Sequence, residues 1–503
     1  MRISDIVKSW VERSPDHPAL VEAAGFWSYA QLNRAIEESQ AWLLNLGVRP
    51  GDRVMIVGEN CRAFVAILLA LAGIDAWPVL VNARLSAREI DEIQDHCGAR
   101  RVVYTTSVST HAGKHAQRHG AAIENIPNLG LTGVGPLNEI TEPEPLNPNW
   151  GDRVAALIYT SGSTGHPKGV MLTHRNLLFA ASGSAKIRSL GPGDRVYGVL
   201  PLSHVAGLSV AFIGALMSGA TLCLFRHFDP TEAFNALRND YLTVILGTPA
   251  MFALLVEYAG LKGIGGAEFP RLRIISSAGA PLHADLKSAA ERLFGRPLQN
   301  AYGMTECSPN IAQTRIESPV SDTSVGPVFP GVEIKLIGSD RKPVADGDVG
   351  ELWVRGPNIM KGYYRAPEET AAAVDAEGWF NTRDLARLEN GNLYIAGRSK
   401  ELIIRFGFNV YPAEVEAVLN THPAVARSAV IGRPAAGGQG DEEVIAFVQP
   451  QPRISLLAAD LADHAARHLA PYKRPSRISI IPVIPLTPNG KIAKDELAKL
   501  GAG

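Results

Sequence analysis

A glycine-rich segment, Tyr159–Gly169, contains the residues of this chain whose chemistry is easiest to interpret. Its glycines let the backbone approach a ligand closely and adopt positive φ, and the exposed amides of such a turn form a concave site for an anion. Lys168 adds a positive charge. The other residues expected around a bound phosphate are Thr160, Ser161, Gly162, Ser163, Thr164 and Gly165. Together they indicate a phosphate-binding loop rather than a flexible linker.

The surroundings of Lys168 differ from the loop of ordinary P-loop NTPases. That pattern has glycine before the lysine and serine or threonine after it, whereas Pro167 and Gly169 occupy these positions here. The segment therefore argues against a P-loop NTPase while it still predicts phosphate binding.

A second set of polar residues lies in the segment Asn300–Glu306. The Tyr302 ring can stack on adenine, the Thr305 hydroxyl can hydrogen-bond a phosphate, and Glu306 can hold a hard cation. Magnesium prefers oxygen ligands and usually takes only one or two carboxylates beside phosphate and water. Alone, these residues would more often form a turn with a surface charge, but their position after the loop favours a nucleotide site.

The Tyr159–Gly169 segment resembles the signature of the adenylate-forming superfamily, which contains acyl-CoA synthetases, firefly-type luciferases and peptide-synthetase adenylation domains. The resemblance covers nearly the whole chain, and further motifs follow in the superfamily's order: Asn300–Glu306, Gly378–Asp384, Gly397–Glu401 and Pro488–Lys491. It implies an enzyme that uses ATP and Mg²⁺ to activate a small-molecule carboxylic acid as an acyl-adenylate, and then passes the acyl group to coenzyme A.

The resemblance also implies roles for individual residues. Thr305 would meet the α-phosphate, Thr164 and Glu306 would hold the metal, Asp384 would accept the ribose hydroxyls, and Arg398 would be directed at the nucleotide. The remaining positions that it places around ATP or coenzyme A are Gly279, Ala280, Pro281, Asn300, Ala301, Tyr302, Gly303, Lys400 and Gly407.

Lys491 matches the mobile catalytic lysine of the superfamily. When a carboxylate oxygen attacks the α-phosphorus, negative charge builds on an already anionic centre, and a positioned cation lowers that barrier. The context Pro485–Lys491 also resembles that of acetylated members, which implies a protein acetyltransferase as a partner. His204, which matches an element beside the acyl pocket, is a further catalytic candidate; a hydrogen-bonded core histidine is the alternative.

Two positions depart from the common pattern of the superfamily. Arg383 stands where many relatives have glycine, just before the ribose carboxylate, and this puts the nucleotide affinity in question. Phe406 stands where many have a small residue, next to Gly407, so the channel for the pantetheine arm of coenzyme A would be narrower. Neither departure removes a catalytic group.

The elements that must position these residues follow an alternating pattern of helices and strands, which predicts crossover units and mostly parallel sheets. Ser28 is expected to cap a helix that ends near Gly47. Strands are expected at Arg53–Val57 and Arg101–Tyr104, and the Pro- and Glu-rich stretch Thr141–Trp150 is expected to link two subdomains.

The expected fold class is α/β, with a large N-terminal domain over residues 1–399. This domain would contain two parallel-rich αβ subdomains and, from Gly326 onward, a small β-barrel-like subdomain of short strands. Residues 400–503 would form a small mobile α+β domain. The resemblance implies two orientations of that domain: one brings Lys491 into the site, and the other lines the coenzyme A channel with Phe406–Val410.

The composition is that of an ordinary globular protein, with 503 residues, 20% of them charged, and a formal net charge of -1. No basic excess indicates a nucleic-acid partner, and no apolar run reaches the ~20 residues of a membrane span. Four scattered cysteines indicate free thiols. We therefore expect a cytoplasmic enzyme without a nucleic-acid or membrane partner, and a homodimer is left open.

Two other functions stay open: an acyl-AMP ligase that charges a carrier protein, and a nucleotide-binding protein that has lost catalysis. The nature of the pocket favours a medium-chain fatty acid or an aromatic acid. Its candidate residues are mostly small or apolar: His204, Val205, Ala206, Gly207, Leu208, Ala278 and Gly279. A dicarboxylic acid would require a buried arginine, which the sequence alone does not place.

Overall fold

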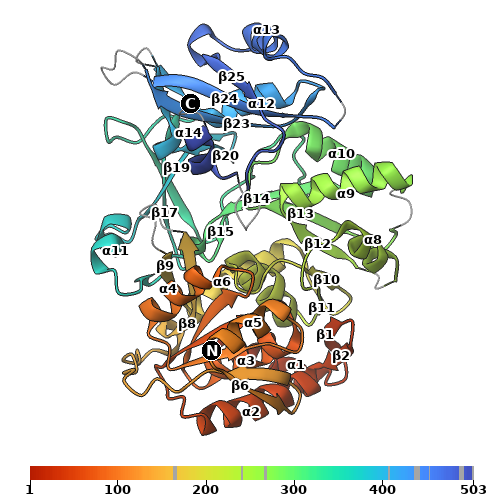
Figure 1. Cartoon of the computed structure of the whole chain (residues 1–503), viewed down its shortest axis with the longest axis vertical. Helices are drawn as coiled ribbons and strands as arrows, with labels where there is room; N and C mark the ends of the chain where they lie inside the picture. Colours follow the sequence, from red (N-terminus) through yellow and green to blue (C-terminus); the bar gives the residue numbers. More distant parts are fainter. Residues whose placement is uncertain are drawn as a thin grey trace.

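The computed structural model describes residues 1–161, 167–239, 242–265, 269–405, 408–435, 442–452, 454–486 and 492–500. Two large sheets with helices between and around them form the body of the molecule. The residues after Ser399 form a smaller unit, which lies at the end of the long axis that is farther from the N-terminal helices (Figure 1).

The first sheet has eight strands in the order β18-β9-β8-β4-β3-β5-β7-β6. Its central strands β8, β4, β3 and β5 are parallel, as the alternating pattern predicts. The strands are β3 (Arg53–Gly58), β4 (Trp77–Asn82), β5 (Arg101–Tyr104), β6 (Ala122–Ile126), β7 (Gly130–Val134), β8 (Val154–Ser161), β9 (Pro167–Thr173) and β18 (Gly362–Tyr363).

The second sheet also has eight strands, in the order β15-β14-β13-β12-β10-β11-β1-β2. Its strands from β14 to β1 are parallel, and an antiparallel strand closes each edge. The strands are β1 (Pro18–Glu22), β2 (Gly25–Ser28), β10 (Arg195–Gly198), β11 (Thr221–Leu224), β12 (Val244–Gly247), β13 (Ile274–Ala278), β14 (Leu298–Gly303) and β15 (Asn310–Gln313).

The two sheets do not correspond to two consecutive blocks of sequence. The hairpin β1–β2 at the start of the chain pairs with β11 in the second sheet. Strands β8 and β9, which follow Thr141–Trp150, return to the first sheet. The prediction that this stretch separates two subdomains is therefore wrong, because strands of the first sheet lie on both sides of it.

Helices fill three layers around the two sheets. One core cluster lies between the sheets and contains α3, α6 and a π-helix; α4 and α5 cover the outer face of the first sheet, and α8, α9 and α10 cover that of the second. None of the helices in the described ranges is long and apolar enough to cross a bilayer. The body helices are α1 (Lys8–Arg13), α2 (Tyr29–Asn45), α3 (Arg62–Gly73), α4 (Ala87–Cys97), α5 (Thr110–Arg118), α6 (His174–Ile187), the π-helix η3 (Ala206–Ile213), α7 (Gly214–Met217), α8 (Pro230–Asn239), α9 (Pro249–Lys262), α10 (Ala284–Phe294) and α11 (Pro367–Ala373), with short 3-10 turns η1 (Ile3–Ile6), η2 (Trp150–Asp152) and η5 (Thr305–Cys307).

Local signals explain several of these helices. Ser28 caps α2 as predicted: its hydroxyl accepts from the Gln31 amide while the Gln31 side chain accepts from the Ser28 amide, a reciprocal arrangement that satisfies two backbone donors. Helix α3 is apolar on all sides and is buried along most of its length. A helix of this composition belongs between two sheets, which is where α3 lies.

The β-rich part of the body is a four-stranded antiparallel sheet in the order β16-β17-β19-β20. It comprises β16 (Glu333–Ile337), β17 (Val349–Arg355), β19 (Phe380–Glu389) and β20 (Asn392–Arg398). The edge strands β16 and β20 do not pair with each other within the described chain. The prediction of short antiparallel strands is confirmed, and an antiparallel bridge between Gly326 and Leu393 continues the pairing beyond β20.

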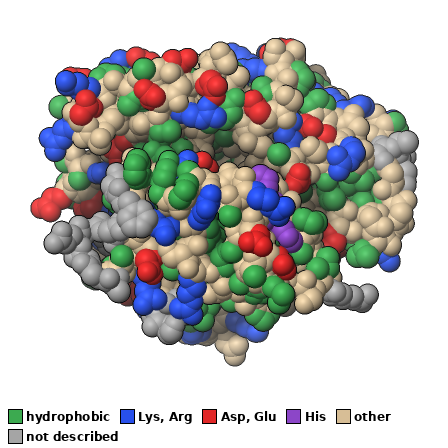
Figure 2. Space-filling model, turned by 90° about the horizontal axis from the view of Figure 1, so that it is seen from above, with side chains coloured by type: hydrophobic (Ala, Val, Ile, Leu, Met, Phe, Trp, Pro, Cys, Tyr) green, Lys and Arg blue, Asp and Glu red, His purple; other side chains and the backbone are tan. Residues whose placement is uncertain are grey.

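The C-terminal unit is an α+β arrangement. A three-stranded sheet, β23-β24-β25, packs with α12, α13 and α14. Figure 2 views the molecule from this end and shows basic and acidic side chains interspersed over the surface. The elements are η6 (Ser399–Glu401), β21 (Ile403–Arg405), β22 (Phe408–Val410), α12 (Pro412–Asn420), β23 (Val425–Pro434), β24 (Glu442–Pro450), α13 (Ala458–His468), η7 (Pro471–Lys473), β25 (Arg477–Ile480) and α14 (Lys494–Leu500).

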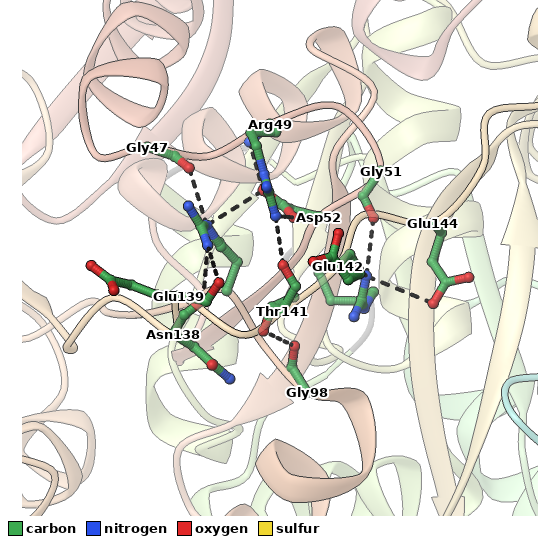
Figure 3. Close-up of polar contacts among 12 residues, drawn as sticks. Gly47, Arg49, Gly51, Asp52, Gly98, Asn138, Glu139, Thr141, Glu142 and Glu144 are labelled. Atoms are coloured by element: carbon green, nitrogen blue, oxygen red, sulfur yellow. Dashed lines mark hydrogen bonds and ion pairs between the residues drawn. The ribbon is translucent and has the colours of Figure 1, made fainter.

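Arginines hold the segment before Trp150 against the first sheet (Figure 3). A guanidinium can bond several carbonyl oxygens at once, so this proline-rich segment is fastened through its backbone. Arg49, Arg53 and Arg100 donate to the carbonyl oxygens of Thr141, Glu142 and Asn138, at 2.6, 2.7 and 2.9 Å respectively. The cavity beneath the segment is lined by none of the residues that the sequence predicts for the nucleotide site.

His174, the first residue of α6, predicts a pH dependence of stability. Its side chain is fully buried, Nδ1 accepts from the Ile3 amide at 3.1 Å, and burial lowers the pKa of the imidazole to about 4. Below pH 6.5 this imidazole is protonated in the unfolded chain but stays neutral in the folded chain. Stability should therefore fall by about 1.4 kcal/mol per pH unit between pH 6.5 and 4 because of this residue.

Denaturant titrations at pH 7 and pH 5 of the native chain and of His174→Gln would measure this loss. The substitution should abolish about 2 kcal/mol of the difference between the two pH values. His111→Gln, at an exposed histidine, should leave the difference unchanged. An equal pH dependence in all three proteins would show that His174 is not responsible.

Candidate active site

The glycine-rich segment includes the end of strand β8 and the start of strand β9, which pair antiparallel. In the register of β8 and β9, Thr160 is opposite Lys168 and Ser161 is opposite Pro167. The segment thus begins in a buried strand, as predicted. Its residues Gly162, Ser163, Thr164 and Gly165 lie outside the described residues, and Ser161 is described only by its backbone.

Lys168 and Glu306 face the same tyrosine, Tyr363. The Lys168 Nζ lies 5.1 Å from the centroid of the Tyr363 ring, and the Tyr363 hydroxyl donates to Glu306 Oε1 at 2.9 Å. Burial and the neighbouring Glu306 carboxylate both raise the pKa of Tyr363, so its hydroxyl keeps the proton that it donates. Strand β18 carries Tyr363 and pairs with β9, which carries Lys168, so these two side chains come from neighbouring strands.

Glu306 and the preceding threonine lie on the short turn η5 and are almost buried. Thr305 is 7% exposed and Glu306 is 8% exposed. Gly303 precedes them at a close approach of the chain, since a Cβ atom there would lie 1.8 Å from the Pro309 carbonyl oxygen. Only glycine can occupy this position without moving the backbone. A carboxylate is a suitable oxygen donor for Mg²⁺, so the donor chemistry of Glu306 fits that ion; Thr164, the other predicted metal ligand, lies outside the described residues.

Asp384, Arg398 and Tyr302 form a second cluster of predicted residues. Asp384 is opposite Arg398 in the register of β19 and β20, with 3.3 Å between Oδ1 and Nε. The other carboxylate oxygen, Oδ2, accepts a hydrogen bond from the Tyr302 hydroxyl. Burial, together with the nearby Asp384 carboxylate, raises the pKa of Tyr302. Stacking of Tyr302 on adenine stays a prediction. The structure shows that the Tyr302 hydroxyl holds the Asp384 carboxylate.

The backbone conformation at Arg383 is one that glycine adopts more easily than arginine. Its backbone has φ of +60°, a conformation that costs a non-glycine residue about 1–2 kcal/mol. Glycine would recover this cost but lose about 0.5–1 kcal/mol through backbone entropy. Because the Arg383 side chain is exposed, Arg383→Gly should raise the free energy of unfolding by about 0.5–1 kcal/mol.

Denaturant unfolding of Arg383→Gly would measure this gain. Arg387→Gly is the matched control, because Arg387 lies on the same strand without a positive φ, and glycine in a strand interior is destabilising. A loss of stability in both variants would contradict the strain that we assign to Arg383.

The residues expected beside adenine and the acyl group lie at the carboxyl end of β13. Ala278 ends this strand opposite Ala301 of β14. Gly279 follows with φ of +86°, and Gly279, Ala280 and Pro281 are exposed. Ligands of open α/β sheets bind outside the carboxyl ends of the strands, so the position of this loop is consistent with its predicted role.

Asn300 has a structural role that its motif does not indicate. Its amide group donates to the carbonyl oxygens of Thr323 and Ser324, at 3.0 and 3.2 Å. The side chain is 3% exposed. The predicted contact of Asn300 with the cofactor therefore rests on the resemblance alone, while its visible contacts fasten the chain after β15.

His204 lies two residues before the π-helix η3. Its Nδ1 accepts from the Ala206 amide at 3.2 Å, and Gly207 passes so close to Pro201 that a Cβ atom would lie 2.1 Å from the carbonyl oxygen. Single turns of π-helix are frequent at functional sites. The sequence predicted His204 and this small-residue segment but not the π-helical conformation.

Sequence reasoning missed two positioning residues, Asn60 and Tyr363. Asn60 is buried between β3 and α3, and its amide group donates to the carbonyl oxygens of Gly198, Leu200 and Phe225 at 3.0–3.2 Å. It therefore holds the segment that leads to His204. Only the polar character of Asn60 at the end of a buried strand could have indicated this role, and no sequence signal pointed to Tyr363.

The C-terminal unit provides fewer described site residues. Lys400 is exposed on η6, whereas Phe406, Gly407 and Lys491 lie outside the described residues. Lys494, three residues after Lys491, contacts Glu401 Oε2 at 2.7 Å and Glu416 Oε1 at 3.2 Å. The pKa of Lys494 is raised, because these carboxylates outweigh the effect of burial.

Comparison with known proteins agrees with this geometry. The family model of AMP-binding enzymes matches residues 7–364, and that of the AMP-binding enzyme C-terminal domain matches residues 414–491. The chain is 32% identical to a feruloyl-CoA synthase from an Amycolatopsis species, with 98% of each chain covered. It is 30% identical to an indoleacetate–CoA ligase from Aromatoleum aromaticum, with 99% of this chain and 98% of the relative covered.

A solved structure of ATP-bound MatB from Rhodopseudomonas palustris superimposes with a TM-score of 0.87 at 28% identity, over 99% of each chain. The chain belongs to the family of AMP-binding enzymes, and the predicted superfamily is confirmed. Its class is that of the AMP-forming acid–thiol ligases.

Proposed function

We propose that the protein is an ATP-dependent carboxylate–CoA ligase. A carboxylate and ATP give acyl-AMP and pyrophosphate, and the thiol of coenzyme A then gives acyl-CoA and AMP. The observation that carries this proposal is the meeting of three separate elements at Tyr363, whose hydroxyl donates to the buried Glu306 carboxylate and whose ring faces the Lys168 ammonium group.

Each described cluster suits one part of ATP. Lys168 and the amides of the glycine-rich turn would bind phosphates, with Thr305 at the α-phosphate. Asp384, held by Tyr302 and Arg398, would accept the ribose hydroxyls. Glu306 and Thr164 would hold Mg²⁺, which neutralises phosphate charge when bound.

The catalytic cation of the first step would be Lys491. As the acid attacks, it forms a bond to the α-phosphorus while the bond to pyrophosphate breaks, and the charge on the phosphoryl oxygens increases. A cation placed there stabilises this charge. We assign residues 1–399 to the domain that binds both substrates and residues 400–503 to a mobile domain that presents Lys491 in one orientation and Phe406–Val410 to coenzyme A in the other.

We assign the acid to a class with an apolar body, either a medium-chain aliphatic or an aromatic acid. The pocket residues near His204 and Ala278 are small or apolar. The relatives named feruloyl-CoA synthase and indoleacetate–CoA ligase act on aromatic acids according to their names, which supports the aromatic option.

A panel assay of the purified chain tests this function. AMP release would be measured with ATP, Mg²⁺ and coenzyme A across fatty, aryl and dicarboxylic acids, with acyl-CoA detected by mass. Thioester that forms with one class of acid would support the ligase. Acid-dependent pyrophosphate exchange without thioester would instead indicate a carrier-protein acceptor, and the absence of exchange with every acid would refute the catalytic assignment.

A further inference from the structure

Arg188 is a cation buried inside the body of the molecule. It follows α6 directly and is 3% exposed. One guanidinium nitrogen, Nη1, donates to the Ser184 hydroxyl, and Nη2 donates to Ser276 Oγ at 3.3 Å. Nε has no acceptor. Within the described residues, no carboxylate forms an ion pair with this guanidinium.

A buried charge without a counter-ion is rare, because it costs several kcal/mol to remove the ion from water. Burial lowers the pKa of Arg188 to about 10, so the group is still charged at neutral pH. A contact with the Ser184 carbonyl oxygen at 3.4 Å caps the end of α6, but that contact needs only one of five donors. Nη1 and Nη2 also donate to the two serine hydroxyls, so Nε and the second N–H of Nη2 are the donors left for an anion within the described part of the chain.

Arg188 reaches the inner face of the second sheet. Ile274 and Ser276 alternate to the same face of β13, and Ile274 packs in the core cluster that contains α6 and the π-helix. Ser276 precedes Gly279, at the carboxyl end of the strand, by three residues. The guanidinium therefore lies roughly 10 Å below the edge where we expect the reacting carboxyl group of the acid.

Two further polar side chains without partners belong to the same interior. Gln313 is fully buried, and in the part of the chain that the structure describes neither its side-chain oxygen nor its side-chain nitrogen has a hydrogen bond. Gln313 pairs with Ala301 of β14, and Ser276 pairs with Gln299 of β14. Because Gln299 and Ala301 alternate to the same face of the sheet, Gln313 and Ser276 also lie on that face. Ser209, on the π-helix that packs against α6, also has a fully buried and unpartnered hydroxyl. A bound acid with only apolar atoms at its distal end would leave Arg188, Gln313 and Ser209 without hydrogen-bond partners, and each unsatisfied buried group costs free energy.

We propose that Arg188 is a specificity-determining residue that pairs with a second carboxylate at the distal end of the acid. The substrate is then a dicarboxylic acid with an apolar body and about 10 Å between its carboxyl groups. This inference rests on the proposed ligase function and narrows its substrate class. The small residues near His204 contact the body of the acid, and the distal carboxylate supplies the missing counter-ion.

Matched acids test this assignment directly. kcat/KM would be measured for nonanoate against nonanedioate and for cinnamate against 4-carboxycinnamate. The native chain should prefer a diacid about 100-fold or more, which corresponds to ~2.7 kcal/mol. Arg188→Met should abolish this preference, because kcat/KM should fall for the diacids and stay unchanged for the monoacids. Arg188→Lys should retain part of the preference. Arg34→Met, at an exposed arginine of α2, should change neither rate.

Thermal unfolding separates specificity from a structural role. Without substrate, Arg188→Met should melt at or above the temperature of the native chain, because an apolar side chain replaces an unpaired buried charge. Nonanedioate should raise the melting temperature of the native chain and not that of the variant. A preference for monoacids, or an unchanged ratio in Arg188→Met, would overturn the proposal while the ligase function stands. A lower melting temperature with equal loss of both activities would reduce Arg188 to a helix cap, and no thioester from any acid would refute the ligase function itself.

Discussion

Replacement of Lys491 by glutamine is expected to lower adenylation by at least about 100-fold, because loss of one group that stabilises transition-state charge commonly costs 10²–10³ in rate. The second step should keep a near-native rate, since the acyl-adenylate already exists and Lys491 would have left the site. Acid-dependent pyrophosphate exchange measures the first step. Thioester formation from synthetic acyl-AMP and coenzyme A measures the second.

The matched control is Lys499→Gln, because Lys499 is an exposed lysine of the same C-terminal segment. It should leave both steps unchanged. Site-specific acetyl-lysine at position 491 should reproduce the glutamine variant, which is the effect required if a protein acetyltransferase regulates this enzyme. Native pyrophosphate exchange in either Lys491 variant would refute both the catalytic and the regulatory assignment.

Elements with strong local signals could be predicted from the sequence. The capping residue Ser28 marks the start of α2, and β5 spans Arg101–Tyr104 as predicted. The strand predicted at Arg53–Val57 extends by one residue in β3. These signals depend on neighbouring residues only. The motif residues were found in the same way, because each motif is contiguous in the sequence, even where residues of separate motifs such as Tyr302 and Asp384 are in contact.

Pairing between distant segments could not be predicted in this way. The hairpin β1–β2 joins the second sheet beside β11, about two hundred residues away in the chain, and β9 pairs with β18. No local pattern specifies such partners, since every buried parallel strand has a similar apolar composition. The same limit applies to Arg188, whose burial depends on α6, the π-helix and β13 together.

The two carboxylates predicted to take part in binding of ATP and its metal ion each accept a hydrogen bond from a buried tyrosine. Tyr302 donates to Asp384, and Tyr363 donates to Glu306. In each pair the tyrosine and the carboxylate come from different elements, and burial raises the pKa of the tyrosine. Hydrogen bonds of this kind fix the orientation of a ligand-binding carboxylate before the ligand arrives. Elements of the body alone thus orient these two carboxylates.

Glu306→Gln is expected to lower adenylation by about 100-fold or more and to raise the Mg²⁺ concentration needed for half-maximal rate, because the substitution removes the one charged metal ligand that we assign. Glutamine can still accept from the Tyr363 hydroxyl, so the fold should be unchanged. Tyr363→Phe keeps the charge and removes only the 2.9 Å hydrogen bond; it should cost about 10-fold, as losses of partners behind metal ligands do. Pyrophosphate exchange at increasing Mg²⁺ measures both variants. If Glu306→Gln kept the native Mg²⁺ dependence, the metal would be held elsewhere and Glu306 would only anchor Tyr363.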